Sequence, residues 1–307
     1  MSAVVAAACS SFGATPRDDD GEAGVDGGAG ADVPTTITPR DGGSACAIGK
    51  PFPSGTQVPV AGGYSVEAAR FTDDPPTFAY VSLCPSDGGK AGCDLFTSRV
   101  SAGGELGAHS SVGAVNKPGY DSYATATADL NHLVFGSSRA GGVRIFVDTA
   151  VGGKFEGSSI TTLALPSGAT AANEPYVLAA GTILYFAAFD PNADEGWEIY
   201  RSEGSAPTFG PAAKVEGVGS KEDENAPVVT EDELEIFFAS GRLGDDGIDV
   251  FTAQRSSSSV PFESPRKLTE LSAGGNDWPV WISPDGCELY YIQKPSNVGL
   301  LFKTSRR

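Results

Sequence analysis

The chain has 307 residues, enough for one large domain or two ordinary ones, and 40% of them are hydrophobic. Its 40 glycines and 21 prolines, and the lack of any window with helical apolar spacing over three turns, favour many short strands over helices. The formal net charge of −18, with Arg306-Arg307 as the only basic cluster, argues against a nucleic-acid partner.

The N-terminus predicts export. Small and aliphatic residues from Ser2 to Ala8 lead to Cys9, and small residues before a cleavage point are typical of signal sequences. Ala-Ala-Cys after an aliphatic run resembles a bacterial lipobox, in which the cysteine is lipidated. An ordinary Ala-rich start with an incidental cysteine is the alternative. We interpret residues 1–9 as a signal-peptide remnant and Cys9 as the lipidation site. Membrane attachment is expected only through this anchor, because no apolar stretch of membrane-spanning length is present.

Residues 10–45 form an acidic stretch that is otherwise rich in glycine and alanine. Its carboxylates are Asp18, Asp19, Asp20, Glu22, Asp26 and Asp32. Such a composition cannot bury enough apolar surface to offset the entropy lost on ordering. We therefore expect a disordered linker between the anchor and the folded domain, which we assign to residues 46–307.

Five cysteines favour an oxidising compartment. Cys84 and Cys93 flank a Gly-rich loop that could close into a disulfide hairpin, and Cys46 and Cys287 complete an even set beside Cys9. Zinc binding is the competing explanation, but the sequence has no Cys-x-x-Cys pair. We expect disulfides and an exported protein.

A repeat of about 52 residues organises the rest of the chain. Its anchor positions are Ala69, Tyr123, Pro175, Pro227 and Pro279, with spacings of 54, 52, 52 and 52 residues. About ten residues after each anchor comes an apolar run that reads as a buried strand. A Gly-rich turn and a third strand with an aromatic residue at a fixed place follow, as in residues 144–147 and 249–252. A fourth, weaker strand comes next, as in residues 265–268.

Four strands repeated at this spacing predict an all-β, five-bladed propeller of four-stranded antiparallel blades. The blades begin near residues 67, 121, 173, 225 and 277. The turn Ser283-Pro284-Asp285-Gly286 and the strand ends at residues 135–139 and 238–242, where an Arg precedes a Gly-rich turn, resemble TolB-like, WD40-like propeller repeats. The resemblance covers about residues 50–307 and implies the fold and an envelope setting.

The last repeat stops after its third strand, and the segment before the first repeat resembles a fourth strand. We therefore predict that an N-terminal strand completes the C-terminal blade and leaves no open edge. Cys46 would lie just before this strand and Cys287 at the start of the second strand of the same blade, so we predict a Cys46–Cys287 disulfide. Closing so long a loop constrains the unfolded chain by several kcal/mol in the entropic model.

Polar residues two places before each anchor are the main candidate site. They are Glu67, Asp121, Asn173, Asn225 and Asp277. The innermost strands of a propeller line its channel, so these side chains could gather at one mouth and bind a cation or sugar hydroxyls. The alternative is structural, because Asp and Asn before a strand cap nearby backbone groups. Trp278 and Trp281 could stack on a ligand there or pack in the core.

A second candidate is an acidic loop at residues 190–198. Asp190, Asn192, Asp194 and Glu198 place oxygen ligands at alternate positions, as in a calcium loop, although the glycine comes one place late. A plain acidic hairpin is the alternative. The sequence predicts no cofactor other than this candidate calcium ion.

These features predict a monomeric, non-enzymatic propeller lipoprotein that faces the periplasm or the cell exterior and binds a protein or ligand. The resemblance to TolB-like propellers implies an envelope protein or a surface ligand as the partner. The alternative is a carbohydrate-binding or glycoside-hydrolase propeller. It would place two of Glu67, Asp121 and Asp277 about 5–10 Å apart in an open cavity.

Overall fold

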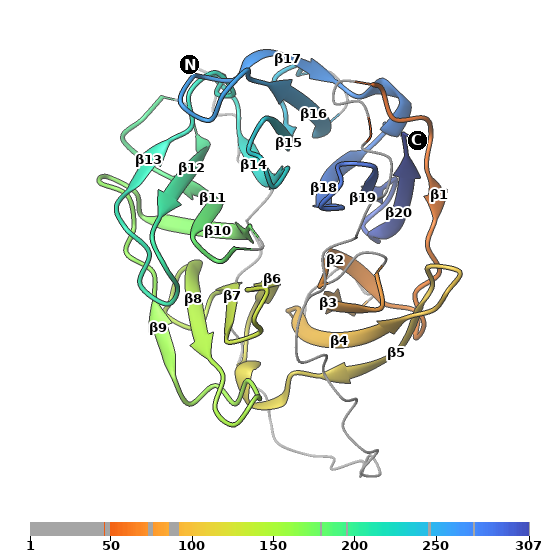
Figure 1. Ribbon diagram of the computed structural model, residues 1–307, viewed down its shortest axis with the longest axis vertical. Helices are drawn as coiled ribbons and strands as arrows, with labels where there is room; N and C mark the ends of the chain where they lie inside the picture. The colour runs from red at the N-terminus through yellow and green to blue at the C-terminus, as the bar shows by residue number, and fades with distance from the viewer. Residues whose placement is uncertain are drawn as a thin grey trace. The chain divides into compact units, whose positions relative to one another are not determined.

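The computed structural model describes residues 46, 50–72, 76–85, 92–178, 180–194, 196–244, 247–272 and 274–306. Within these ranges the chain forms five four-stranded antiparallel sheets. The sheets follow one another around a common centre as the blades of a propeller (Figure 1). The predicted five-bladed β-propeller is therefore confirmed. The expected signal remnant at residues 1–9, with Cys9, and the expected linker at residues 10–45 lie outside the described residues.

Each blade has four strands, which run in order from the centre to the rim. The innermost strands are β2 (Ser65–Phe71), β6 (Asp121–Ala126), β10 (Ala171–Val177), β14 (Glu224–Val229) and β18 (Asn276–Ile282). The second strands are β3 (Phe78–Cys84), β7 (His132–Ser137), β11 (Ile183–Phe189), β15 (Glu235–Ser240) and β19 (Glu288–Lys294). The third strands are β4 (Asp94–Val100), β8 (Arg144–Thr149), β12 (Trp197–Glu203), β16 (Asp249–Gln254) and β20 (Leu300–Ser305). The outermost strands are β5 (Leu106–Ser111), β9 (Ile160–Thr162), β13 (Ala212–Lys214), β17 (Glu263–Lys267) and β1 (Thr56–Gln57).

The only helices among the described residues are two single 3-10 turns, η1 (Gly113–Val115) and η2 (Thr269–Leu271). Each turn lies between the outermost strand of one blade and the innermost strand of the next. Neither is long or apolar enough to cross a membrane.

The aromatic residues of the repeat form the core of the blades. Stacked rings join the second and third strands in four blades, with centroids 5.6–6.0 Å apart. The pairs are Phe135–Phe146, Phe186–Tyr200, Phe238–Phe251 and Tyr291–Phe302. Each pair lies directly opposite in the strand register. Such pairs add about 0.5–1.5 kcal/mol beyond the area that they bury.

The ring closes between the two ends of the chain, as predicted. Strand β1 lies alongside β20 in Figure 1, and the two pair antiparallel, with Thr56 opposite Lys303. The Val58 N–H continues the pairing by donating to the Leu301 carbonyl at 2.8 Å. Because β1 pairs with the outer edge of β20, part of that edge is covered against pairing with another chain.

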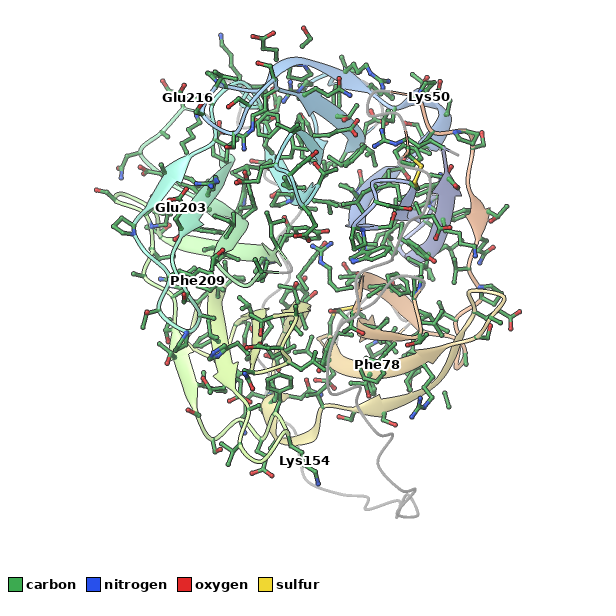
Figure 2. All side chains as sticks on the ribbon, viewed as in Figure 1. Lys50, Phe78, Lys154, Glu203, Phe209 and Glu216 are labelled. Carbon is green, nitrogen blue, oxygen red and sulfur yellow. A yellow bond between two sulfur atoms is a disulfide. The ribbon has the colours of Figure 1, made fainter. Side chains whose placement is uncertain are left out.

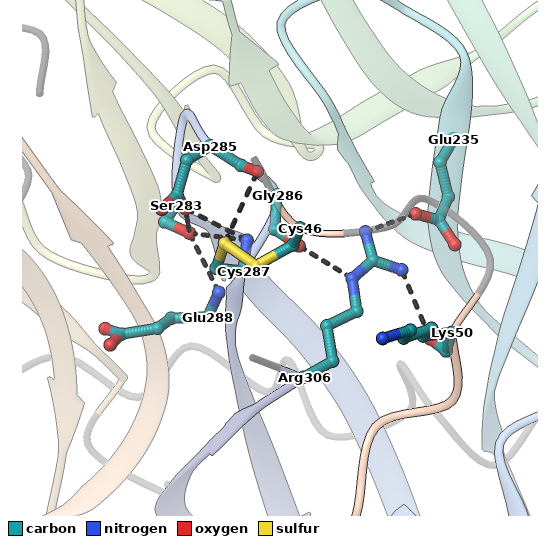
Figure 3. The surroundings of a disulfide bond; sticks show 9 residues. All are labelled: Cys46, Lys50, Glu235, Ser283, Asp285, Gly286, Cys287, Glu288 and Arg306. Atoms are coloured by element: carbon teal, nitrogen blue, oxygen red, sulfur yellow. Dashed lines mark hydrogen bonds and ion pairs between the residues drawn. A yellow bond between two sulfur atoms is a disulfide. The ribbon is translucent and has the colours of Figure 1, made fainter. Parts of the chain in front are cut away.

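The predicted disulfide between Cys46 and Cys287 is present and fastens the closing segment (Figure 3). Its Cα atoms are 5.3 Å apart, and its ends are separated by 241 residues. Arg306 lies beside it and donates to the Gly286 carbonyl at 2.8 Å. The same guanidinium pairs with Glu235 of the neighbouring blade at 2.6 Å, with both side chains buried. The segment before the first blade, the end of the last blade and the neighbouring fourth blade are thus joined at one place.

The second predicted disulfide, Cys84–Cys93, links the end of β3 to the residue before β4. The Glu67 carboxylate and these two sulfur atoms lie within 4.8 Å of one another. Sulfur atoms joined in a disulfide offer no thiolate to a metal, so this group is not a metal site. Two disulfides are typical of proteins that fold in an oxidising compartment and indicate an exported chain.

The turn between the first and second strands has the same hydrogen-bonding pattern in three blades. These turns lie at one end of the axis. In each copy a Thr or Ser hydroxyl donates to an Asp two residues later, at 2.5–2.7 Å. The pairs are Thr127–Asp129, Thr230–Asp232 and Ser283–Asp285. The residue after each Asp has a positive φ, and only the last copy places glycine there. The Pro-Asp-Gly motif seen in the sequence is therefore one version of a more general turn.

Candidate functional site at the propeller axis

The residues predicted to ring the channel mouth lie near the start of the innermost strands, at one end of the axis. The structure places them at two successive positions. Asn173 and Asn225 pair with the residue directly after the stacked aromatic of the second strand. Asp121 and Asp277 pair with the next residue along that strand and are fully buried. Because successive side chains point to opposite faces of a strand, the two sets face different surroundings.

Asp121 is held by its own blade. Its Oδ1 pairs with Arg139 at 2.7 Å, and its Oδ2 accepts the Lys117 N–H at 2.7 Å. Arg139 also donates to the Val115 carbonyl at 2.6 Å and lies over the Phe135 ring. This carboxylate therefore joins the strand to the loop that precedes it.

The fourth blade repeats this arrangement with a longer acid. Glu224 pairs with Arg242 at 3.1 Å and accepts the Ser220 N–H at 2.7 Å, while Arg242 also donates to the Val218 carbonyl. Arg139 and Arg242 are the arginines of the two strand-end motifs that the sequence shows. The motif has a structural role in both blades.

Glu67 and the tryptophans also have partners. Lys294 donates to Glu67 across the junction of the first and last blades at 2.6 Å, and its ammonium lies 4.9 Å from the centroid of Trp278. Trp281 is buried and packs on Phe71, with centroids 5.1 Å apart. Trp278 thus covers an ion pair, and Trp281 belongs to the core near the axis.

A bulge in the innermost strands turns backbone N–H groups toward the preceding blade. Tyr123, Glu174 and Ala226 stand at this bulge with φ values of 53°, 59° and 47°. The left-handed region is uncommon for residues other than glycine, and it needs surrounding contacts to persist. The Tyr123 N–H donates to Ser82 Oγ at 2.9 Å, and the Ala226 N–H donates to Glu174 Oε2 at 2.5 Å. The bulges therefore tie neighbouring blades together near the axis.

A buried Glu–Arg–Tyr cluster lies among these bulges. The Arg70 guanidinium carbon is 4.8 Å from the centroid of Tyr176 and 5.9 Å from that of Tyr123. Arg70 is 2% exposed and Glu174 9%. Burial raises the pKa of the Glu174 carboxyl to about 7, because desolvation outweighs the Ala226 N–H and the charge of Arg70. Burial also lowers the pKa of Arg70 to about 10, which leaves it charged at neutral pH.

A small cavity of about 50 Å³ opens beside this cluster. Its lining comes from the far ends of the innermost strands and the turns that follow, the opposite end from the predicted ring. The lining includes Arg70, Tyr80, Thr125, Tyr176, Glu231 and Trp281. Of the predicted ligand-binding residues, only Trp281 reaches it. Figure 2 shows side chains directed from all the blades toward the middle of the ring, while Lys154 and Glu216 lie on its outer edge.

The residues of the predicted calcium loop make other contacts in the structure. Asp190 Oδ1 accepts the Asn192 N–H at 2.8 Å, which is a turn-capping bond, and Asp194 is exposed. Glu198 lies in β12, where it pairs with Lys214 at 3.0 Å. Among the described residues of the loop, nothing supports a calcium site.

Sequence reasoning missed the axial cluster. Arg70 is the only basic residue in the five innermost strands, and this is the signal that the sequence offers. Glu174 falls between Asn173 and Pro175 of the anchor motif, and no other repeat has a glutamate at this place, so the repeat pattern does not mark it. Arg70 and Glu174 come close to each other only because the first three blades meet at the axis.

No family model and no curated protein matches the sequence. Among solved structures, the chain resembles a GH43_1 enzyme from Xanthomonas citri, with a TM-score of 0.58 and 14% identity over 82% of this chain and 91% of that one. It also resembles an endo-arabinase from Bacteroides thetaiotaomicron, with a TM-score of 0.51 and 15% identity over 83% and 97% of the two chains. TolB from Acinetobacter baumannii aligns with a TM-score of 0.45 and 17% identity over 74% of this chain and 52% of TolB, so the chain spans about half of that protein.

These likenesses concern the fold. At such identities a shared propeller does not carry an activity from one protein to another. The two of these structures with TM-scores above 0.5 are a GH43_1 enzyme and an endo-arabinase by name, whereas the sequence motifs resemble TolB-like repeats. The fold of this chain is a five-bladed β-propeller, and the comparisons add no activity to it.

Proposed function

We propose that this chain is a non-enzymatic binding propeller of the extracytoplasmic compartment. It is tethered to a membrane surface through a lipid on Cys9 and engages an envelope protein or surface ligand at one face of the propeller. The disulfides support export, and the TolB-like strand-end and turn motifs support an envelope partner.

The observation that carries this proposal is the use of the candidate carboxylates inside the fold. Asp121 joins its strand to the preceding loop through Arg139, and Glu67 pairs with Lys294 across two blades. Neither they nor Asp277 line the axial cavity. A glycosidase needs one carboxyl group to protonate the leaving oxygen and another on the opposite side of the sugar ring. Carboxylates engaged in structural ion pairs are poorly placed for that work.

Hydrolysis assays test the choice between binding protein and enzyme. The oxidised chain is incubated with aryl glycosides and polysaccharides, including arabinan, the substrate type named by one structural neighbour. We expect no turnover above the protein-free blank. Turnover that is lost on Asp277→Asn or Glu67→Gln while the fold is retained would establish the carbohydrate enzyme instead.

Photo-crosslinking in cells tests the binding face. A crosslinking residue replaces Leu243, in the turn after β15, or Val151, after β8; the strand directions place these at opposite ends of the axis. Both are 51% exposed. A third position, Glu216 on the outer edge, is the control (Figure 2). We expect one defined adduct from one face only, and equal patterns from all three positions would argue against a specific partner.

Metabolic labelling with a palmitate analogue tests the anchor. We expect label on the wild-type chain and none on Cys9→Ser. Retained label on that variant would remove lipid tethering from the proposal.

A further inference from the structure

The Arg70 guanidinium is buried without a hydrogen-bond partner. Its Nε, Nη1 and Nη2 atoms are all inaccessible to solvent, and none has a partner among the described residues. A guanidinium carries five N–H donors. Burying a charged group is costly unless it is paired and its donors are satisfied. The described residues therefore do not supply the hydrogen-bond acceptors that the buried guanidinium of Arg70 needs.

The surroundings of Arg70 offset its charge only in part. The Tyr176 and Tyr123 rings attract the cation through their faces but accept none of its N–H bonds. The Glu174 carboxylate, which also acts on its charge, accepts the Ala226 N–H and bonds to the Tyr123 side chain. Glu174 therefore directs its oxygens at other donors, and the guanidinium has no acceptor among the described residues.

A second residue that lines the cavity, Tyr80, carries a donor without a partner. The Tyr80 hydroxyl is buried and has no hydrogen-bond partner among the described residues. Burial raises the pKa of Tyr80 well above its ordinary value, so the hydroxyl keeps its proton. Arg70 has only donors, and Tyr80 has a proton to donate. A group with only acceptors, such as a carboxylate, complements both.

The size and walls of the cavity limit the ligand. A volume of about 50 Å³ holds a carboxylate with a short substituent. Trp281, Ile282 and Val177 form apolar walls, while the exposed Glu231 and Pro284 stand at the mouth. Water could satisfy the donors, but it carries no charge to offset the buried guanidinium. The cavity thus suits a small acid whose charged end points inward and whose short body meets the apolar walls.

We propose that this axial cavity binds a small aliphatic carboxylate, which displaces the side chains that cover the guanidinium of Arg70, pairs with that guanidinium and accepts a hydrogen bond from the hydroxyl of Tyr80. Arginine suits this task because its planar fork matches a carboxylate with two parallel N–H bonds. The site is independent of the proposed protein partner, since it needs only the closed ring of blades. The carboxylate site lies at the end of the axis opposite the polar residues predicted to ring the channel mouth.

Thermal unfolding and calorimetry with propionate test the site. Propionate is titrated at constant ionic strength against propionamide, which has nearly the same shape but no charge. We expect propionate to raise the unfolding midpoint saturably and propionamide to leave it unchanged. Sulfate is the third probe and is expected to give no saturable shift. Saturable binding of sulfate in place of propionate would overturn the carboxylate assignment.

Variants locate the binding. Arg70→Met keeps the length and apolar stem of the side chain and is expected to weaken propionate binding by at least about tenfold, as the loss of a charge-assisted pair does. Arg99→Met, at an exposed arginine of the same blade, removes the same charge and should bind as wild type. Tyr80→Phe removes a single oxygen and should weaken binding several-fold, so it tests the site even if Arg70→Met does not fold. Unchanged binding in Tyr80→Phe and in a folded Arg70→Met would refute the proposal.

Discussion

At the scale of single residues, the axis is held by polar groups that sequence patterns do not mark. Arg70 comes from the first blade, Glu174 from the third, and the Ala226 N–H from the fourth. No spacing within one repeat could bring them together, because their contact depends on the ring being closed. The sequence predicts that innermost strands face a channel, but which side chains fill it depends on the bulge in each strand.

Glu174 should make stability depend on pH. Its pKa is about 7 in the folded chain and near 4.5 when exposed, so the folded state binds more protons between these values. Its contribution to stability is full below pH 4.5 and is lost as the pH rises through 7. We expect Glu174→Gln to be more stable than wild type at pH 8, by a few kcal/mol, and to match it at pH 4.5. Urea unfolding across this range measures the effect, with the exposed Glu231→Gln as control; parallel curves for wild type and Glu174→Gln would contradict it.

Asp121 should be needed for folding stability. Asp121→Asn leaves Arg139 without its counter-charge and is expected to cost about 3 kcal/mol, because removing one member of a buried pair strands the other. Glu203→Gln is the matched control, since Glu203 is 69% exposed and its pair with Arg201 should contribute less than about 1 kcal/mol. Denaturant midpoints compare the two. Equal, small losses would show that Asp121 is not a structural clamp.

At the scale of elements, the repeat made most of the fold predictable. The third-strand aromatic stands at a fixed place in every unit, and in four blades it stacks on the second strand. The closing strand could be predicted because the last repeat lacks one. The positions of single side chains in the innermost strands could not be predicted in the same way. Asn173 and Asp277 occupy equivalent places in the sequence repeat but different positions in the strand register. One inserted residue at a bulge shifts that register, and composition does not reveal it.

The two disulfides should differ in their effect. The entropic model gives about 5.5 kcal/mol for a loop of 241 residues and about 2.6 kcal/mol for one of nine. We therefore expect Cys46→Ser/Cys287→Ser to lower the free energy of unfolding by about twice as much as Cys84→Ser/Cys93→Ser. Equilibrium unfolding of both double variants under oxidising conditions makes the comparison. A larger loss from the Cys84–Cys93 pair would show that local strain or packing outweighs loop closure.

At the scale of the whole molecule, closure should determine the state of association. The complete last blade has only the short strand β1 at its edge, and a net charge of −18 keeps copies apart. We expect the full chain to sediment as a monomer. Deleting residues 50–60, which include β1, should expose β20 and produce concentration-dependent self-association. A deletion variant that folds and stays monomeric would show that β20 is protected in another way.

The position of the long disulfide also has a mechanical consequence. Cys46 precedes β1 in the chain, and its partner Cys287 lies directly before β19, the second strand of the last blade. A pull applied to the chain before residue 46 passes through the sulfur bridge into that blade and does not load the short β1–β20 pairing. The two-residue closing strand β1 therefore carries none of this tension. Under reducing conditions the same pull would peel β1 away first, so the propeller's resistance to force is set by the redox state of one bond.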